Sequence, residues 1–450
     1  SRVPCFCSVR KEKAQNLINS GLCEVDHLPE LLWDLPNGEI SLTRYHYHDH
    51  ISERFAEAFA DNCGDWCKAH GIELTGHMME EPSLHSQTAA IGDCMRSYRG
   101  FGIPGIDMLC NRHEFTTAKQ AQSAVHQYGY EGMLSELYGV TGWDCDFRTY
   151  KHQGDWQACL GVTIRVPHLS WYAMKGEAKR DYPASIHYQS PWYKKYNLIE
   201  DHFARVNTAL VRGTPNIKVG VIHPVESLWV HWGPSSQTAL ERQKLDKCFE
   251  DVTNWLLFGS IDFDYISESL LPALCEKGAN PIKVGKMEYD VIIVPACETI
   301  RSTTLKLLEE FAANGGKLVF MGNAPKYVDA TASDAGVKLC EKATHIEFTR
   351  TDLLRELDAY RTIDIRNSNG FYTENLVHQL RFDGDSMWLF IAQGKVSPND
   401  DCSSKQAVKI TIRGLYTPTL YNTLSGNIEA IPCKYIGGNT VIDWALWAHD

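Results

Sequence analysis

The sequence predicts an α/β protein with a (β/α)8-type barrel, then a doubly wound α/β domain and a small β-sandwich. Between Gly71 and Val211, strand-like and helix-like runs alternate, as in parallel strands joined by crossover helices. A second alternation starts after Asn216. From about Thr344, short strand-like runs are separated by glycine-containing turns. We therefore expect three domains, over residues 1–215, 216–343 and 344–450.

The barrel region offers four clear strands, at Ile72–Met79, Ile103–Leu109, Gly132–Leu137 and Val162–Pro167. Helices are expected at Ser86–Tyr98, Thr117–Tyr128, Phe147–Leu160 and Pro191–Val211. A closed barrel needs eight strands. Either the earlier strands are disguised in the first 60 residues, where Phe6–Val9 is a candidate, or the chain starts part-way through a barrel.

A histidine-rich segment, RYHYHDH at Arg44–His50, comes before the first clear strand. In an extended chain His46, His48 and His50 would share one face and could bind a metal. The alternative is a polar segment at the surface or beside a cleft. Ser52 to His70 then shows helical spacing, with Ser52 as the expected N-cap.

The second alternation predicts strands at Lys218–His223, Phe263–Ile266, Asp290–Pro295 and Lys317–Phe320, with helices at Gln243–Phe258 and Thr303–Asn314. Cys297 follows one of these strands, but no strained Gly-x-Cys-x-Gly turn surrounds it. We therefore interpret Cys297 as a small buried residue and not as a nucleophile. The sandwich strands are expected at Leu376–Phe382, Ser386–Ala392, Ala407–Ile412, Thr417–Tyr421 and Thr440–Trp444.

Composition narrows the classes of partner. The net charge of −12 and the absence of a Lys/Arg run argue against a nucleic-acid surface. No segment has the length of a membrane span or the pattern of a signal peptide, and the 15 cysteines show no zinc-site spacing. We expect a cytoplasmic protein with reduced thiols and no membrane partner, and self-association is left open. The 12 Trp and 20 Tyr suit sugar stacking as well as a large core.

Polar or aromatic residues follow each of the four strands in the barrel region. Glu136 closes the run at Tyr130–Trp143, YEGMLSELYGVTGW, and Asp107 closes GIPGIDML. The other clusters are His77, Glu80 and Glu81 after the first strand, and His168 and Trp171 after the fourth. Parallel α/β folds place their chemistry at the C-terminal ends of the strands, so these side chains are the candidate site.

Paired carboxylates at such a site are what glycoside hydrolysis requires: one donates a proton to the leaving oxygen, and the other activates water or attacks the sugar. Glu81 and Glu136 are the best-placed pair, although Glu80 could take the place of Glu81, because adjacent residues of an extended chain face opposite ways. The candidate substrate-binding residues are His77, Glu80, Asp107, Trp143, His168, Trp171, Tyr172, Lys179, Arg180 and Asp181.

Several motifs resemble glycoside hydrolase family 106, the α-L-rhamnosidases. They are Thr75–Glu81 (TGHMMEE), Ser135-Glu136, Gly154-Asp155-Trp156-Gln157, Val166-Pro167-His168 and Gln189-Ser190-Pro191-Trp192, within residues 44–235. The resemblance implies a (β/α)8 barrel, Glu81 as general acid, Glu136 as general base, inversion of configuration and a bound calcium ion. Its calcium ligands cannot be placed on this sequence. The large N-terminal portion of rhamnosidases has no counterpart here, which leaves the substrate open.

Residues 216–340 resemble the glutamine-amidotransferase-like domain that follows the barrel in family 42 β-galactosidases, a flavodoxin-type fold that serves assembly there. The β-rich tail is similar to the accessory sandwiches of these enzymes. The leading hypothesis is an exo-glycosidase acting on an oligosaccharide or glycoside, with α-L-rhamnoside as the first substrate. The alternatives are a β-galactosidase-like enzyme, a non-catalytic carbohydrate-binding protein, and an amidotransferase-like protein, which the setting of Cys297 disfavours.

Overall fold

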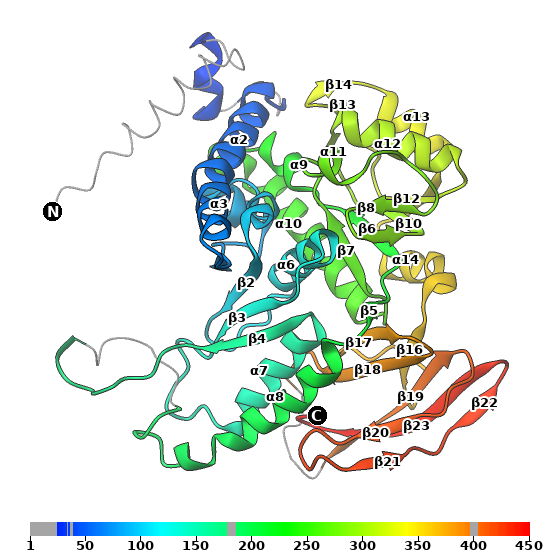
Figure 1. The fold of residues 1–450 in the computed structure, drawn as a ribbon. Helices are drawn as coiled ribbons and strands as arrows, with labels where there is room; N and C mark the ends of the chain where they lie inside the picture. The colour runs from blue at the N-terminus through cyan, green and yellow to red at the C-terminus, as the bar shows by residue number, and fades with distance from the viewer. Residues whose placement is uncertain (1–24, 34, 37–38, 178–185, 397–403) are drawn as a thin grey trace.

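The computed structural model describes residues 25–33, 35–36, 39–177, 186–396 and 404–450 (Figure 1). Three groups of strands succeed one another along the chain: a parallel sheet, a second parallel sheet, and a set of antiparallel strands. The strand Phe6–Val9 that the sequence suggested lies outside the described residues.

The first sheet has the order β1-β2-β3-β4, and all three pairings are parallel. Its strands are β1 Thr75–His77, β2 Ile103–Met108, β3 Met133–Leu137 and β4 Val162–Pro167. The helices around it are α4 Leu84–Ala90, α5 Cys94–Ser97, α6 Phe115–Tyr128, α7 Phe147–Cys159 and α8 Asn197–Leu210. All four expected strands are confirmed, as are helices within the expected ranges; the range Ser86–Tyr98 is divided between α4 and α5.

The sheet is open, so the expected (β/α)8-type barrel is not closed in the described part of the chain. Neither β1 nor β4 pairs with a further described strand. In the region expected to hide earlier strands, the described residues contain helices, at Val25–Leu31 and at residues 42–69, and no strand. On the face that a barrel would enclose, Ile164 is 36% and Val166 42% exposed.

The metal interpretation of the histidine-rich segment assumed an extended chain, and that premise is wrong. These residues lie in helix α2, Leu42–Phe55, which continues through the π-helical turn η3, Ala56–Asp61, into α3, Asn62–Ala69. Ser41 caps α2, its Oγ accepting from the backbone N–H of Arg44 at 3.1 Å. Residues two apart on a helix are separated by about 200° around the axis, so consecutive histidines face opposite sides.

The second sheet is parallel with the order β15-β12-β10-β6-β7, the arrangement of doubly wound flavodoxin-type folds. Its strands are β6 Val219–Ile222, β7 Phe263–Ile266, β10 Val291–Val294, β12 Lys317–Met321 and β15 Thr344–Ile346. The associated helices are α9 Val225–Trp229, α10 Ser235–Leu257, α11 Leu271–Leu274, α12 Ser302–Ala313, α13 Ala335–Lys342 and α14 Arg350–Glu356. Short strands flank them: β8 Ile282–Val284, β9 Met287–Tyr289, β11 Thr299–Ile300, β13 Tyr327–Val328 and β14 Thr331–Ala332.

The antiparallel strands form one sheet of order β16-β19-β23-β22 and another of order β18-β17-β5. They are β5 Thr214–Pro215, β16 Ile363–Asn367, β17 Leu376–Asp383, β18 Ser386–Gln393, β19 Lys405–Arg413, β22 Lys434–Ile436 and β23 Asn439–Trp447, with the hairpin β20 Thr419–Tyr421 and β21 Ile428–Ala430 beside them. Buried side chains from both sheets share one apolar cluster, among them Ile365, Leu380 and Ile410. β5 precedes the second sheet in sequence but pairs with β17. The antiparallel unit therefore includes a strand from the segment between the two parallel sheets.

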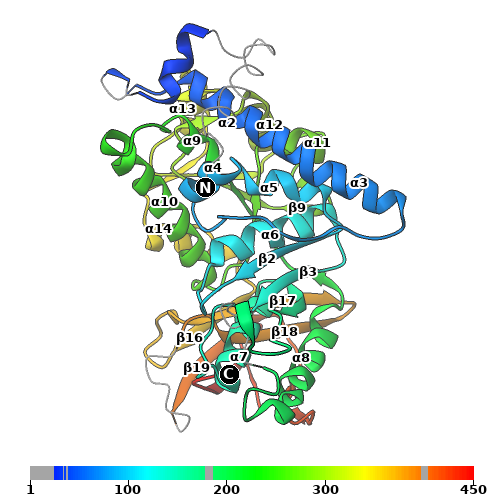
Figure 2. The same cartoon turned by 90° about the vertical axis from the view of Figure 1, so that its left-hand side faces the viewer.

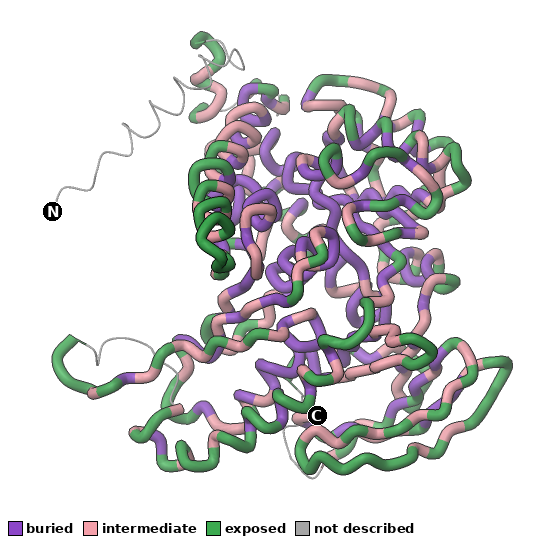
Figure 3. Tube along the Cα trace, in the orientation of Figure 1, coloured by how far each residue is buried: buried purple, intermediate pink, exposed green. Residues whose placement is uncertain are grey.

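The largest core continues from the first sheet into the second. Trp156 of α7, Trp229 of α9 and Phe249 of α10 belong to this cluster, and each is at most 2% exposed. Helices α2 and α4 pack against α9 (Figure 2), and buried residues run between the two sheets (Figure 3). Among the described cysteines none forms a disulfide, Cys63 and Cys67 included. None of the described helices is both long and apolar enough to cross a membrane.

Candidate active site

The candidate site is built on neighbouring strand ends of the first sheet. Asp107 of β2 is the register partner of Glu136 of β3, so their side chains leave the sheet on the same face. Ser135 points the opposite way, is fully buried, and donates through Oγ to Gln157 Oε1 of α7 at 2.5 Å. This bond holds the back of β3 to its helix, and the alternation of the strand leaves the Glu136 side chain 33% exposed on the other face.

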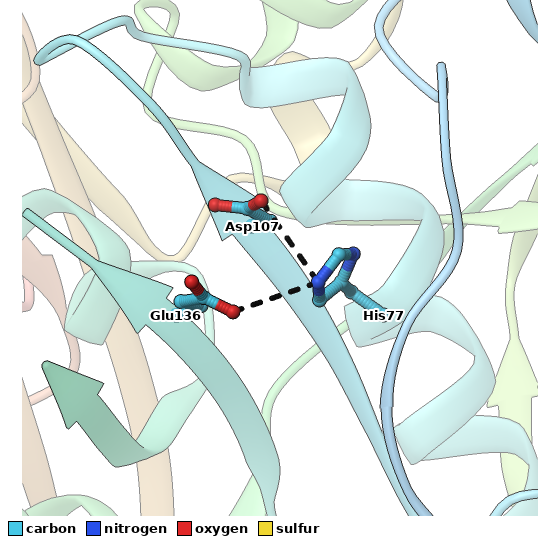
Figure 4. Close-up of side chains that lie close together, drawn as sticks. All are labelled: His77, Asp107 and Glu136. Carbon is cyan, nitrogen blue, oxygen red and sulfur yellow. Dashed lines mark ion pairs between the residues drawn. The ribbon is translucent and has the colours of Figure 1, made fainter. Parts of the chain in front are cut away.

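His77, at the end of β1, faces both carboxylates. Its Nε2 lies 3.9 Å from Asp107 Oδ2 and 3.7 Å from Glu136 Oε2 (Figure 4). His168, just after β4, approaches Glu136 from the other side, with 3.9 Å from Nε2 to Oε1. Four residues that the sequence predicted as site residues, one from each strand end, thus lie around one point.

Both histidines are oriented by the main chain. His77 Nδ1 lies 2.7 Å from the carbonyl oxygen of Met78, and His168 Nδ1 lies 3.2 Å from that of Leu169. Because a carbonyl only accepts, each Nδ1 carries the hydrogen and each Nε2 is directed at the carboxylates. Each Nε2 is therefore the ring atom that faces Glu136.

Asp107 has an environment that favours its protonated form. Burial raises the pKa of Asp107, the charge of Glu136 raises it further, and His77 and His168 oppose this rise. A carboxyl group that keeps its proton above its ordinary pKa beside a second carboxylate is the arrangement that acid–base catalysis requires.

Glu81 lies elsewhere than the sequence led us to expect. Glu80 adopts a left-handed backbone, with φ of 62°, and this turn leaves Glu80 exposed and Glu81 only 5% exposed. Burial raises the pKa of Glu81 to about 7. Its Oε1 has no hydrogen-bond partner among the described residues, and its charge acts on the buried side chains of Tyr98 and Cys94. The role of Glu81 as general acid stays a prediction, because its pKa suits that role while its carboxyl group is closed off from solvent.

Residues with strained backbone conformations are concentrated in the loops of this site. Five of the eight described non-glycine residues with positive φ lie in the loops after β1, β2 and β3: Glu80, Cys110, Asn111, Tyr138 and Val140. Such conformations cost about 1 kcal/mol or more each and concentrate at functional sites. The same strand ends therefore carry both the polar cluster and the strain.

Aromatic side chains lie in the loops that follow β3 and β4. Trp143, in the loop after β3, stacks on Trp171, after β4, with ring centroids 5.0 Å apart and an interplanar angle of 22°. Trp143 is 43% exposed and Trp171 is 9% exposed, so Trp143 presents the accessible ring. Tyr172 is 96% exposed. Lys179, Arg180 and Asp181 lie outside the described residues.

The segment Gly154-Asp155-Trp156-Gln157 supports the site from behind. Asp155 is 1% exposed, and its Oδ1 lies 2.7 Å from His202 Nε2 of α8, while Lys151 Nζ donates to Oδ2 at 2.7 Å. Burial opposes ionisation, but Lys151 and His202 hold the pKa of Asp155 below its ordinary value. Sequence reasoning did not assign these positioning roles; the Lys151–Asp155 spacing of four residues was the available signal.

The same side chains could instead bind a metal ion. One ligand atom each from His77, Asp107 and Glu136 lies within 4.8 Å of the others. Calcium takes six to eight oxygen ligands, whereas this set offers two carboxylates and one imidazole nitrogen. This set of three does not by itself supply the oxygen ligands of a calcium site, and nitrogen–oxygen sets of this kind suit transition metals better. The calcium ion that the resemblance implied stays a prediction.

No protein-family model matches the chain. A putative β-glucuronidase of Formosa agariphila is 23% identical over 314 residues, which are 68% of this chain and 24% of that protein. Among solved structures, a rhamnosidase from Novosphingobium sp. PP1Y matches 90% of this chain with 39% of its own, at a TM-score of 0.68 and 16% identity. The chain shares its fold with this rhamnosidase over the matched part. An exo-carrageenase of family GH42 from Bacteroides ovatus matches 98% of this chain, at a TM-score of 0.65 and 12% identity.

The GH42 β-galactosidase Gan42B matches 99% of this chain with 77% of its own, at a TM-score of 0.62 and 11% identity. The likenesses to the rhamnosidase and to the GH42 enzymes extend over all three groups of strands, since each match covers at least 90% of this chain. The chain spans about a quarter of the length of the β-glucuronidase and about two fifths of the rhamnosidase.

Proposed function

We propose that the chain carries the acid–base centre of a glycoside hydrolase that removes a terminal sugar. The observation that carries this proposal is the convergence of Asp107 and Glu136 from adjacent parallel strands, with His77 between them. The glycoside hydrolases that share the fold support it. The chain spans only part of the length of the β-glucuronidase and of the rhamnosidase. Hydrolysis by the full-length protein is therefore also part of this proposal.

Glu136 acts as nucleophile or base in this proposal. It is the more accessible of the two carboxylates, with 33% of its side chain exposed against 25% for Asp107. Asp107, whose pKa is raised by burial, donates the proton to the leaving oxygen. The nearest ligand oxygens of the two lie within 4.8 Å. Retaining glycosidases hold their carboxyl groups about 5 Å apart, and inverting ones leave room for a water molecule between them, so this pair favours retention.

The Glu81–Glu136 pair is the second assignment, and it is the one that the rhamnosidase resemblance supports. Two isosteric variants distinguish the two. Asp107→Asn is expected to lower kcat by 10²-fold or more, because the acid step contributes on that order. Glu81→Gln is expected to change kcat by less than tenfold, since its carboxyl group is buried. The opposite ranking of the two variants would transfer the acid role to Glu81.

The proposed substrate is an oligosaccharide or glycoside with a terminal α-L-rhamnosyl unit, and a β-galactosyl unit is the alternative. The rhamnosidase match supports the first and the GH42 β-galactosidase match supports the second. The exposed ring of Trp143 suits stacking on the apolar face of either sugar. Release of nitrophenol from a panel of nitrophenyl glycosides, read with the wild-type chain and with Glu136→Gln, tests the activity and identifies the sugar.

A non-catalytic carbohydrate-binding protein is the alternative from another functional class. It would bind sugars through the same aromatic side chains without turning them over. Binding of a sugar to the wild-type chain without hydrolysis of any glycoside in the panel would favour this function.

A further inference from the structure

A cavity lies far along the chain from the residues of the candidate active site. It has a volume of about 600 Å³, between helix α14 and the turn that joins β16 to β17. Its lining residues are Arg350, Thr351, Leu354, Arg355, Asp358, Phe371, Tyr372 and Glu374. In Figures 1 and 2, α14 and β16 lie apart from strands β2 and β3, and none of these residues belongs to the proposed catalytic cluster. The volume is within the range of small-molecule and oligosaccharide sites.

Phe371 supplies an exposed ring at this cavity. It is 69% exposed, yet its backbone is held in place. Asn367 Oδ1 accepts from the N–H of Phe371 at 3.1 Å and from that of Asn369 at 2.9 Å, and the N–H of Asn367 donates to the Phe371 carbonyl at 2.9 Å. Exposing an apolar ring to water is unfavourable, and a ring on a fixed backbone costs little entropy when a ligand stacks on it.

Tyr372 plays a different role, because arginines cover its ring. The guanidinium carbon of Arg366 lies 3.5 Å from the ring centroid, and those of Arg361 and Arg350 lie 5.0 and 5.8 Å away. Each of these arginines also pairs with a carboxylate: Arg366 with Asp364, Arg361 with Asp358 and Arg350 with Glu374. The charged wall of the cavity is thus a set of paired ions.

The pairing of arginines with carboxylates indicates which class of ligand the cavity can bind. Two arginines and two carboxylates line the cavity, so its formal charge is balanced and a phosphate or another small anion gains no net attraction. The carboxylates of Glu374 and Asp358 are 68% and 64% exposed on their side chains, so each keeps oxygen atoms free to accept from hydroxyl groups. Arg355, 70% exposed, offers donors. An exposed ring beside donors and acceptors matches a sugar, which has an apolar face and a rim of hydroxyls.

We propose that this cavity binds an uncharged oligosaccharide, with one sugar ring stacked on Phe371 and its hydroxyl groups paired with Glu374, Asp358 and Arg355. The site is an accessory one, since it lies on different elements from the catalytic cluster. It goes beyond the proposed hydrolase activity and does not require it, because binding here involves neither Asp107 nor Glu136.

Calorimetric titration with neutral oligosaccharides of rhamnose, galactose and glucose tests the proposal. The Glu136→Gln chain is titrated, so that hydrolysis cannot remove the probe. Phe371→Ala in that background is expected to weaken the accessory binding event about tenfold or more, the effect of losing a stacking contact worth about 1.4 kcal/mol. Phe371→Tyr keeps the ring and is expected to keep the affinity.

Two control variants separate this site from others. Tyr435→Ala removes a ring that is 57% exposed on β22, in the same antiparallel unit, and is expected to leave binding unchanged. Trp143→Ala is expected to affect only sugar bound at the catalytic strand ends. Binding unaffected by Phe371→Ala, binding of acidic oligosaccharides alone, or no binding of any neutral probe would each overturn the proposal. Whether the wild-type chain hydrolyses glycosides is read separately, so the two proposals can fail independently.

Discussion

At the scale of single residues, the site depends on which way each side chain leaves its strand. Ser135 and Glu136 show this most clearly: the first is buried against Gln157, and the second faces solvent and Asp107. The alternation of side chains along a strand predicts that these two neighbours face opposite sides of the sheet. His77, Asp107 and His168 were foreseen on the same grounds, because each follows or closes an apolar run that became a strand.

The position of Glu81 could not be foreseen in this way. Alternation shows only that Glu80 and Glu81 face opposite ways, and a left-handed residue at Glu80 decides that Glu81 is the buried one. Left-handed glutamate is uncommon, and no local signal in the sequence marks it.

Glu81 should make stability depend on pH. Its folded-state pKa of about 7 lies above the ordinary 4.5, so between these values the folded chain binds a proton that the unfolded chain has lost. Stability from this group is therefore greatest below pH 4.5 and falls as the pH rises towards 7. From pH 5 to pH 8 the wild-type chain should lose up to about 3 kcal/mol more unfolding free energy than Glu81→Gln. Urea unfolding of both proteins at the two pH values measures this, and parallel pH profiles would contradict it.

At the scale of elements, helix α7 holds β3, the strand of Glu136, in place through the Ser135–Gln157 hydrogen bond. Gly154 allows α8 to approach, since a Cβ at this position would lie 2.0 Å from Phe203 Cζ. The helix is predicted by the local sequence pattern, but the close approach of α8 is a tertiary contact that no local pattern reveals. For the same reason, the spacing of His46, His48 and His50 was consistent with a strand, and the helix that starts at the Ser41 cap overrode it.

Replacement of Gly154 by alanine distinguishes the effect of packing on stability from the effect of helix propensity. An exposed helical glycine gains up to about 1 kcal/mol on replacement by alanine. Gly154→Ala should instead cost about 1–3 kcal/mol, because the added methyl group overpacks the contact with Phe203. Thermal unfolding measures the effect. Thr208→Ala, on the exposed side of α8, is the control and should leave the midpoint almost unchanged. A stabilised Gly154→Ala chain would refute the contact.

At the scale of the whole molecule, a partly buried ionic network joins helix α2 of the N-terminal region to the unit built on the second sheet. Arg301, just before α12, donates to Glu226 of α9 at 2.5 Å and to Asp49 of α2 at 2.6 Å, and Tyr45 donates to the same Glu226 at 2.8 Å. Burial raises the pKa of Glu226, and Arg301 opposes that rise. This network, with the apolar core that continues across the two units, gives them a common interior.

Removing Arg301 should therefore loosen both units together. Arg301→Leu leaves Glu226, with 3% of its side chain exposed, without its cation, and should cost about 3 kcal/mol or more. Arg54→Leu removes an exposed ion pair with Glu57 and should have little effect. Unfolding followed by tryptophan fluorescence measures both variants, and equal effects would show that the network contributes no more than a surface pair.

The order of the three groups of strands could be predicted from the sequence, whereas the open edges of the first sheet could not. Alternation of strand and helix, then of strand and turn, indicated two parallel sheets followed by antiparallel strands, and the register pairings agree. Closure of the first sheet depends on contacts at its two edges, β1 and β4, and no described strand pairs with either edge. A count of local patterns cannot supply such a long-range contact.

The central claim is that Glu136 is a catalytic carboxylate beside Asp107. The most direct measurement is the kcat of Glu136→Gln on the nitrophenyl glycoside that the wild-type chain hydrolyses fastest, together with the affinity for the released sugar. The account predicts a loss in kcat of at least 10³-fold with sugar affinity changed less than about tenfold. Turnover by Glu136→Gln at the wild-type rate would contradict it.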